Sequence, residues 1–115
     1  MAEDLTALLL RDEEMEQRSG ILLTSLLIAF EQDHMTVRGQ LCASSGTLKA
    51  NVALIVSAYD FDGRVVGTLT KLFDRNFFNE FEVFSMRIEV FTYPLSRVLI
   101  YPKLILPRPS YGRRR

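Results

Sequence analysis

Residues 50–59 read ANVALIVSAY, and the residues that follow, 60–73, read DFDGRVVGTLTKLF. The first run is apolar at nearly every position, which is typical of a strand in the middle of a sheet. Asp60 can bond the local backbone and Gly63 can take a positive φ, so the junction predicts a tight turn. Two strands joined by such a turn form an antiparallel hairpin, which we predict over 50–59 and 64–73.

Further strands are predicted on both sides of this hairpin. Residues 35–43 and 81–91 alternate apolar and polar side chains, as strands with one buried face do. Residues 21–31 and 97–105 are two more candidates, and Pro102 in the last belongs at an edge or a bulge because proline cannot donate to a ladder. No helix separates these strands, so a parallel sheet lacks its crossovers. The sequence predicts an all-β fold, an antiparallel immunoglobulin-like β-sandwich of about six or seven strands with a short N-terminal helix.

The N-terminal residues follow a helical period. Leu5, Leu8 and Leu9 share one face of a helix predicted over residues 2–18, and Gly20 offers a stop. We find no convincing N-cap, so this helix would be marginal unless its leucines dock on another surface. That surface is either the chain's own sandwich or a partner subunit, and the sequence leaves both open.

The net charge of zero hides an asymmetry between the two ends of the chain. Residues 1–33 hold eight acids and two bases, whereas residues 97–115 hold six bases and no acid. Such a distribution suits pairing within the chain, head-to-tail contact between copies, or two different partners. The predicted organisation is an acidic helix or arm at 1–19, a β-sandwich at 20–106 and a basic tail at 107–115.

Three stretches between residues 37 and 83 carry a family resemblance. They are VRGQL at 37–41, ANVALIVSAYDFDGRVVGT at 50–68, and the aromatic residues Phe77, Phe78 and Phe81. Together they resemble the FxLYD family of small immunoglobulin-like β-sandwiches, and the turn YDFDGRVV at 59–66 is the most specific element. The resemblance implies a non-enzymatic accessory or interaction domain, with no catalytic residue to carry over.

Residues that commonly carry catalysis or bind metals are scarce. His34 is the single histidine and Cys42 the single cysteine, so neither a histidine metal cage nor an intrachain disulfide can form. A calcium loop begun at Asp60 would need oxygen ligands where Arg64 and Lys71 stand. Phosphate-binding glycine loops and nucleophile-elbow motifs are absent. We therefore expect no enzyme, no cofactor and no catalytic, cofactor-binding or metal-binding residue.

A membrane anchor or an export signal is not predicted either. The most apolar run, ILLTSLLIAF at 21–30, is about half as long as the ~20 residues that a spanning helix needs. Acidic residues precede it where a signal peptide would carry basic ones. We expect a cytoplasmic protein without a transmembrane segment, and removal of a leader stays open.

The expected partner is another protein. Phe77 and Phe78 are consecutive in a turn, so their side chains should point in different directions, with one exposed or covered by a partner. We predict a non-enzymatic interaction or assembly module, a homo-oligomer formed through the N-terminal helix, a strand edge or the Phe-rich loop. Its predicted partner-binding residues are Leu5, Leu8, Leu9, Phe77, Phe78 and Phe81.

The basic C-terminal segment supplies an alternative function. It would bind an anion or a nucleic acid through its arginines and weaken steeply as salt rises. The candidate anion-binding residues are Arg108, Arg113, Arg114 and Arg115.

Overall fold

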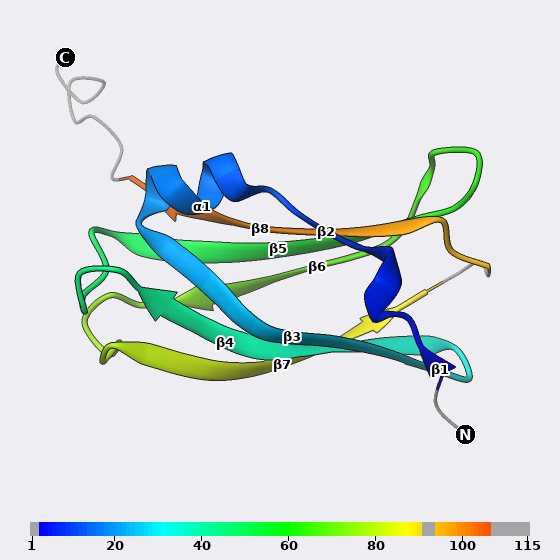
Figure 1. The fold of residues 1–115 in the computed structure, drawn as a ribbon, viewed down its shortest axis with the longest axis horizontal. Helices are drawn as coiled ribbons and strands as arrows, with labels where there is room; N and C mark the ends of the chain where they lie inside the picture. Colours follow the sequence, from blue (N-terminus) through cyan, green and yellow to red (C-terminus); the bar gives the residue numbers. More distant parts are fainter. Residues whose placement is uncertain (1–2, 91–93, 107–115) are drawn as a thin grey trace, which may run out of the picture.

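A computed structural model describes residues 3–90 and 94–106 as two packed four-stranded sheets (Figure 1). Sheet A has the strand order β1-β3-β4-β7, and sheet B has the order β2-β8-β5-β6. The strands are β1 (Glu3–Asp4), β2 (Leu9–Arg11), β3 (Ile21–Glu31), β4 (His34–Ala43), β5 (Asn51–Tyr59), β6 (Val65–Phe73), β7 (Phe81–Glu89) and β8 (Arg97–Ile105). A 3₁₀ helix, η1 (Thr6–Leu8), and an α-helix, α1 (Glu13–Ser19), complete the described elements.

The six long strands confirm the predicted all-β fold. Each begins and ends within two residues of its expected bounds. Alternate side chains of these strands fill the space between the sheets, as the period of two requires. The fully buried ones include Leu23, Ile28, Met35, Val37, Leu41, Val52, Leu54, Val56, Val98 and Ile100. All described strand pairs are antiparallel except β2 with β8, which is parallel.

The β5–β6 turn forms as its residues predict. The Asp60 carboxylate accepts hydrogen bonds from the backbone N–H groups of Asp62 and Arg64, both at 2.9 Å. Gly63 takes a φ of 81°, a conformation that glycine adopts without steric cost. The turn leaves Phe61 74% exposed at one end of the sandwich.

The helix predicted over residues 2–18 is confirmed only over its last third, as α1, and is wrong for residues 3–11. The segment instead crosses between the sheets, because β1 pairs with β3 of sheet A and β2 pairs with β8 of sheet B. Leu5 is 7% exposed in the core, and Leu8 and Leu9 pack against that core. The spacing of these leucines alone favours a helix, but burying them between the two sheets stabilises the extended segment more. Tertiary packing therefore overrides the local pattern.

Only the short helix α1 forms in this region. The Asp12 side chain caps its start by accepting a hydrogen bond from the Met15 N–H at 3.1 Å. Gly20 ends the helix in the left-handed conformation, at a φ of 71°. The chain then turns directly into β3, so α1 lies at the side of the sandwich and contacts both β3 and β8.

Pro102 lies at an edge, as predicted. Strand β2 pairs with β8 only from Val98 to Ile100, so within the described residues the rest of β8 has a strand neighbour on one side alone. Pro102 falls in that part, opposite Leu54, with its side chain buried. A proline, which has no N–H, is tolerated here because β8 has only one neighbouring strand at this point.

Strand β3 contains a bulge that changes which of its side chains point toward the core. Its register against β4 shifts between Thr24 and Leu27, and Ser25 takes a φ of 55°. The extra residue turns Leu26 toward the core, where its Cδ2 would lie 2.6 Å from a Cβ added at Gly39. The glycine on β4 thus makes room for the bulged leucine.

Candidate interaction surface

The outer edges of both sheets carry charged residues that point inward. On β7, Glu82 pairs with Leu41 and so faces the core side of sheet A, although it is exposed. On β6, Lys71 pairs with Leu54, and its Nζ lies 5.6 Å from the centre of the Phe73 ring. Inward charges on edge strands discourage pairing with another chain. These two edges are therefore poor sites for strand addition.

The edge of β3 is capped by the N-terminal segment. The Ile28 N–H donates to Thr6 Oγ1 at 3.0 Å, and its carbonyl accepts from the Leu5 N–H at 2.9 Å. Further along, the Leu23 N–H donates to Glu16 Oε1 at 3.4 Å. Between these two points lies the bulge, which interrupts the ladder. This edge also offers little to an incoming strand.

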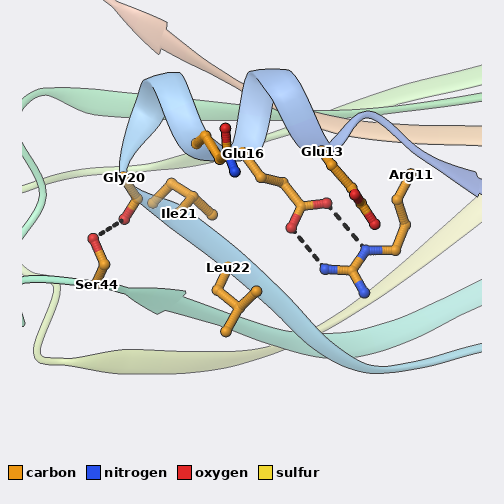
Figure 2. A pocket seen from close by; sticks show the side chains of 8 residues that line it. Arg11, Glu13, Glu16, Gly20, Ile21, Leu22 and Ser44 are labelled. Carbon is orange, nitrogen blue, oxygen red and sulfur yellow. Dashed lines mark hydrogen bonds and ion pairs between the residues drawn. The ribbon is translucent and has the colours of Figure 1, made fainter.

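A groove of about 470 Å³ lies between α1 and the start of β3 (Figure 2). Glu16, whose side chain is 5% exposed, points across it toward Arg11 and accepts from Nη2 at 2.7 Å and Nε at 3.1 Å. This hydrogen bonding raises the pKa of Arg11 above its ordinary value. The Arg11–Glu16 ion pair therefore joins α1 to β2, and the Glu16 bond to Leu23 joins α1 to β3. Because the two charges already neutralise each other, this pair is not available to a ligand.

The exposed end of β1 is held in a similar way. The Asp4 carboxylate accepts from both the hydroxyl and the backbone N–H of Thr6, at 2.6 Å and 2.9 Å. These hydrogen bonds lower the pKa of Asp4 below its ordinary value. Thr6 thereby links β1 to the edge of β3.

The two consecutive phenylalanines separate as predicted. Phe78 is 9% exposed and belongs to the core cluster, whereas Phe77 is 85% exposed. In the core, the rings of Phe73 and Phe84 meet edge to face, with their centroids 6.4 Å apart. The loop before β7 therefore contributes one anchor to the core and one aromatic side chain to the surface.

An exposed apolar row lies on the outer face of sheet A, at the end where this loop enters β7. Leu22 on β3, Cys42 on β4 and Phe81 on β7 are direct neighbours in register. In the next outward row, Val83 pairs with Gln40. The exposed fractions are 50% for Leu22, 52% for Phe81 and 65% for Val83. We call Leu22, Phe77, Phe81 and Val83 the Phe-rich patch.

The structure separates the residues predicted to bind a partner. Phe81 and Phe77 lie in the Phe-rich patch, whereas Phe78 and Leu5 belong to the core of their own chain. Leu8 and Leu9 are half-buried against that core. Leu22 was missed because only the strand register places it in the row of Phe81, and Val83 was missed although it follows Phe81 by two residues on the same face of β7. The arginines of the alternative site, Arg108, Arg113, Arg114 and Arg115, lie outside the described residues.

The single histidine and the single cysteine lie far apart. His34 begins β4 and Cys42 lies near its end, so eight residues of strand hold them about 26 Å apart. Within the same residues, no group of three or more His, Cys, Asp or Glu side chains could hold a metal ion. No described helix has the length and apolar character needed to cross a membrane.

Comparison with known proteins does not place this chain in a family. No protein-family model, no curated protein and no solved structure matches it. The resemblance to the FxLYD family stays a prediction. Function is therefore argued from the surfaces of the molecule itself.

Proposed function

We propose that this protein is a non-enzymatic interaction module that associates with copies of itself through the Phe-rich patch. The observation that carries the proposal is the row Leu22–Cys42–Phe81, which leaves two large apolar side chains about half exposed, together with the 85% exposed Phe77 in the loop that leads into Phe81. Aromatic side chains of this kind are enriched in protein interfaces. The proposed setting is the cytoplasm, where the lone Cys42 would stay reduced.

Two of the three predicted routes to association are less well supported. The described strand edges are capped by Thr6 and Glu16 or carry the inward charges Lys71 and Glu82. The N-terminal leucines pack on their own sandwich. The Phe-rich loop and the sheet face beside it are the route that the exposed apolar surface favours.

The size of the patch suggests how strong the association is. Burying its four side chains would remove on the order of 400 Å² of surface from each copy, which is the size of functional patches on monomers. A standard interface buries about 800 Å² per partner. We therefore expect weak association unless the contact extends along the rest of the sheet face.

The test is the molar mass in solution, measured by light scattering from micromolar to millimolar protein. Phe81→Asp places a charge in the patch and should reduce the oligomer to a monomer. Phe61→Asp changes a more exposed phenylalanine in the β5–β6 turn and should leave the mass unchanged. A wild-type chain that stays monomeric throughout this range overturns the proposal.

We also propose that the sandwich is immunoglobulin-like, as the FxLYD resemblance implies. In that fold, strands A, B and E are neighbours in one sheet, and C′, C and F are neighbours in the other. The orders β3-β4-β7 and β6-β5-β8 support this assignment. Strand β2 then occupies the position of the seventh strand beside β8, although it runs parallel to it. An experimental structure with another strand between β4 and β7 would reject the assignment.

Binding of an anion or a nucleic acid is a second candidate, and one observation favours it. The strands of sheet B contain four basic residues and no acidic one, and β8 leads into the basic tail. The test is the binding of a fluorescent single-stranded oligonucleotide at increasing salt. Binding should weaken steeply and disappear when residues 107–115 are removed. Binding that does not change with salt concentration, or no detectable binding, would exclude this function.

A further inference from the structure

The two sheets carry opposite charge. The charged residues of sheet B strands are Arg11, Lys71, Arg97 and Lys103. The strands of sheet A instead contain five acids and two bases, namely Glu3, Asp4, Glu31, Glu82 and Glu89 with Arg38 and Arg87. Arg11 and Lys71 point inward, as Glu3 and Glu82 do, which leaves Arg97 and Lys103 on the outer face of sheet B. The outer face of sheet A keeps Asp4, Glu31 and Glu89 with Arg38 and Arg87, so the formal charges of the two outer faces are +2 and −1, with His34 neutral.

Both outer faces are also apolar in part. On sheet B, the outward side chains include Leu99 and Tyr101 of β8 and Ile55 of β5, all half-buried. Leu10 beside Leu99 is 49% exposed, and Leu72 at the β6 edge of the same face is 66% exposed. Arg97 and Lys103 flank this apolar area along β8. On sheet A, the Phe-rich patch occupies one end of the face and Glu31 and Glu89 the other.

The three ways of stacking two copies differ in their electrostatics. Two sheet B faces would bring Arg97 and Lys103 against the same cations of the other copy. Two sheet A faces would oppose surfaces that both carry an excess of acid. Only a sheet A face against a sheet B face joins apolar surface to apolar surface and places opposite charges together.

We infer that copies of this chain stack head to tail, with the outer face of sheet A of one copy on the outer face of sheet B of the next. This inference rests on the proposed self-association and names the surface that receives the Phe-rich patch. Each copy keeps one face free after each contact, so the assembly is an open chain rather than a closed dimer. Packed sheets lie about 10 Å apart, which lets the outward side chains of the two faces interdigitate.

A second copy fits the sheet B face better than a nucleic acid does. Between Arg97 and Lys103, β8 presents Leu99 and Tyr101, and Ile55 of β5 lies opposite Tyr101. Nucleic-acid surfaces place aromatic rings and several cations along the path of the backbone. One aromatic ring among aliphatic side chains, flanked by single cations, is instead the pattern of a protein interface, with its apolar core and polar rim.

The experiment uses two full-length variants, each blocked on one face. Phe81→Asp blocks sheet A, and Leu72→Asp blocks sheet B at a side chain exposed enough to leave folding intact. Circular dichroism confirms that both fold. Light scattering of each variant alone should give a monomer. An equimolar mixture should give a dimer and nothing larger, because only one intact pair of faces remains.

Other outcomes separate this inference from the proposed function. If Leu72→Asp alone keeps the wild-type mass while Phe81→Asp is monomeric, the Phe-rich patch pairs with itself; self-association then stands and the head-to-tail contact falls. A mixture that stays monomeric overturns the head-to-tail contact as well. A wild-type monomer overturns both, and loss of oligonucleotide binding in Leu72→Asp would then assign the sheet B face to a nucleic acid.

Salt provides an independent measurement on the wild-type chain. Contact between faces of opposite charge should weaken by about tenfold in affinity between low and ~1 M salt. Lys103→Glu should weaken the association at low salt in the same direction. Association that is unchanged or strengthened by salt would reject the electrostatic pairing of unlike faces.

Discussion

The two long sides of the sandwich are closed by different means. Between β3 and β8, residues 3–19 fill the gap and bond to the β3 edge through Thr6 and Glu16. Between β6 and β7, the described strands meet directly, and a Cβ added at Gly67 would lie 2.6 Å from the Glu89 carbonyl oxygen. The side between β3 and β8 is held by a few polar contacts. The side between β6 and β7 closes because Gly67 has no side chain. The two sides should therefore respond differently to substitution.

The largest expected effect is on the β6–β7 side. Gly67→Ala forces a methyl group against the backbone of β7, which cannot move as easily as the end of a side chain. We expect the free energy of unfolding to fall by about 3 kcal/mol, as for a severely overpacked core. Urea denaturation measures this change. Thr70→Ala, at an exposed position of the same strand, should stay within about 0.5 kcal/mol.

On the opposite side, Glu16→Ala removes the carboxylate that joins α1, β2 and β3. The substitution leaves the Arg11 guanidinium and the Leu23 N–H without this acceptor. We expect a loss of about 2 kcal/mol, below the value for a fully buried pair because Arg11 is 35% exposed and can reach water. The control is Glu14→Ala, whose partner Arg18 is 72% exposed. A loss there as large as for Glu16→Ala would contradict the assigned role.

Thr6→Val is a smaller change on the same side. It keeps the shape of the side chain but removes the acceptor of the Ile28 N–H. We expect a loss of about 1 kcal/mol and faster hydrogen exchange at the Ile28 amide. Thr6→Ser keeps the hydroxyl and should keep the protection of that amide. Equal exchange in both variants would show that the Thr6 hydroxyl does not hold the β3 edge.

The smallest effect on stability is expected for the inward charges of the β6–β7 side. Lys71→Val and Glu82→Val replace exposed or half-exposed groups and should change the unfolding free energy by less than about 0.5 kcal/mol. They should nevertheless promote aggregation on prolonged incubation, because the edge strands lose the charges that discourage pairing. Thioflavin binding over time measures this, with Thr70→Val on β6 as the control. Unchanged aggregation would leave these charges without a protective role.

The sequence predicted the long strands better than it predicted the N-terminal segment. Alternation of apolar and polar residues determines which face of a strand is buried, and 35–43 and 81–91 show it clearly. The leucines of residues 5–9 have the spacing of a helical face, yet they pack between two sheets that the local pattern does not contain. The end of the short helix was predicted at Gly20, and its start could have been found because Asp12 is an N-cap type.

The candidate site was predictable only in part. That Phe77 and Phe78 would separate follows from their adjacency in a turn, and the structure confirms it. The contribution of Leu22 depends on a register set by the turns before and after β4, which no local pattern specifies. The charge difference between the sheets was visible in the sequence only as a difference between the chain ends.

The parallel pairing of β2 with β8 has a consequence for biosynthesis. The segment Leu9–Arg11 is translated near the beginning of the chain, but its partner Val98–Ile100 belongs to the last described strand. A ribosome must therefore synthesise nearly the whole domain before this ladder can close. Until then, Leu9 and Leu10 lack the neighbouring strand beside which they lie, so this apolar segment stays unpaired on the nascent chain.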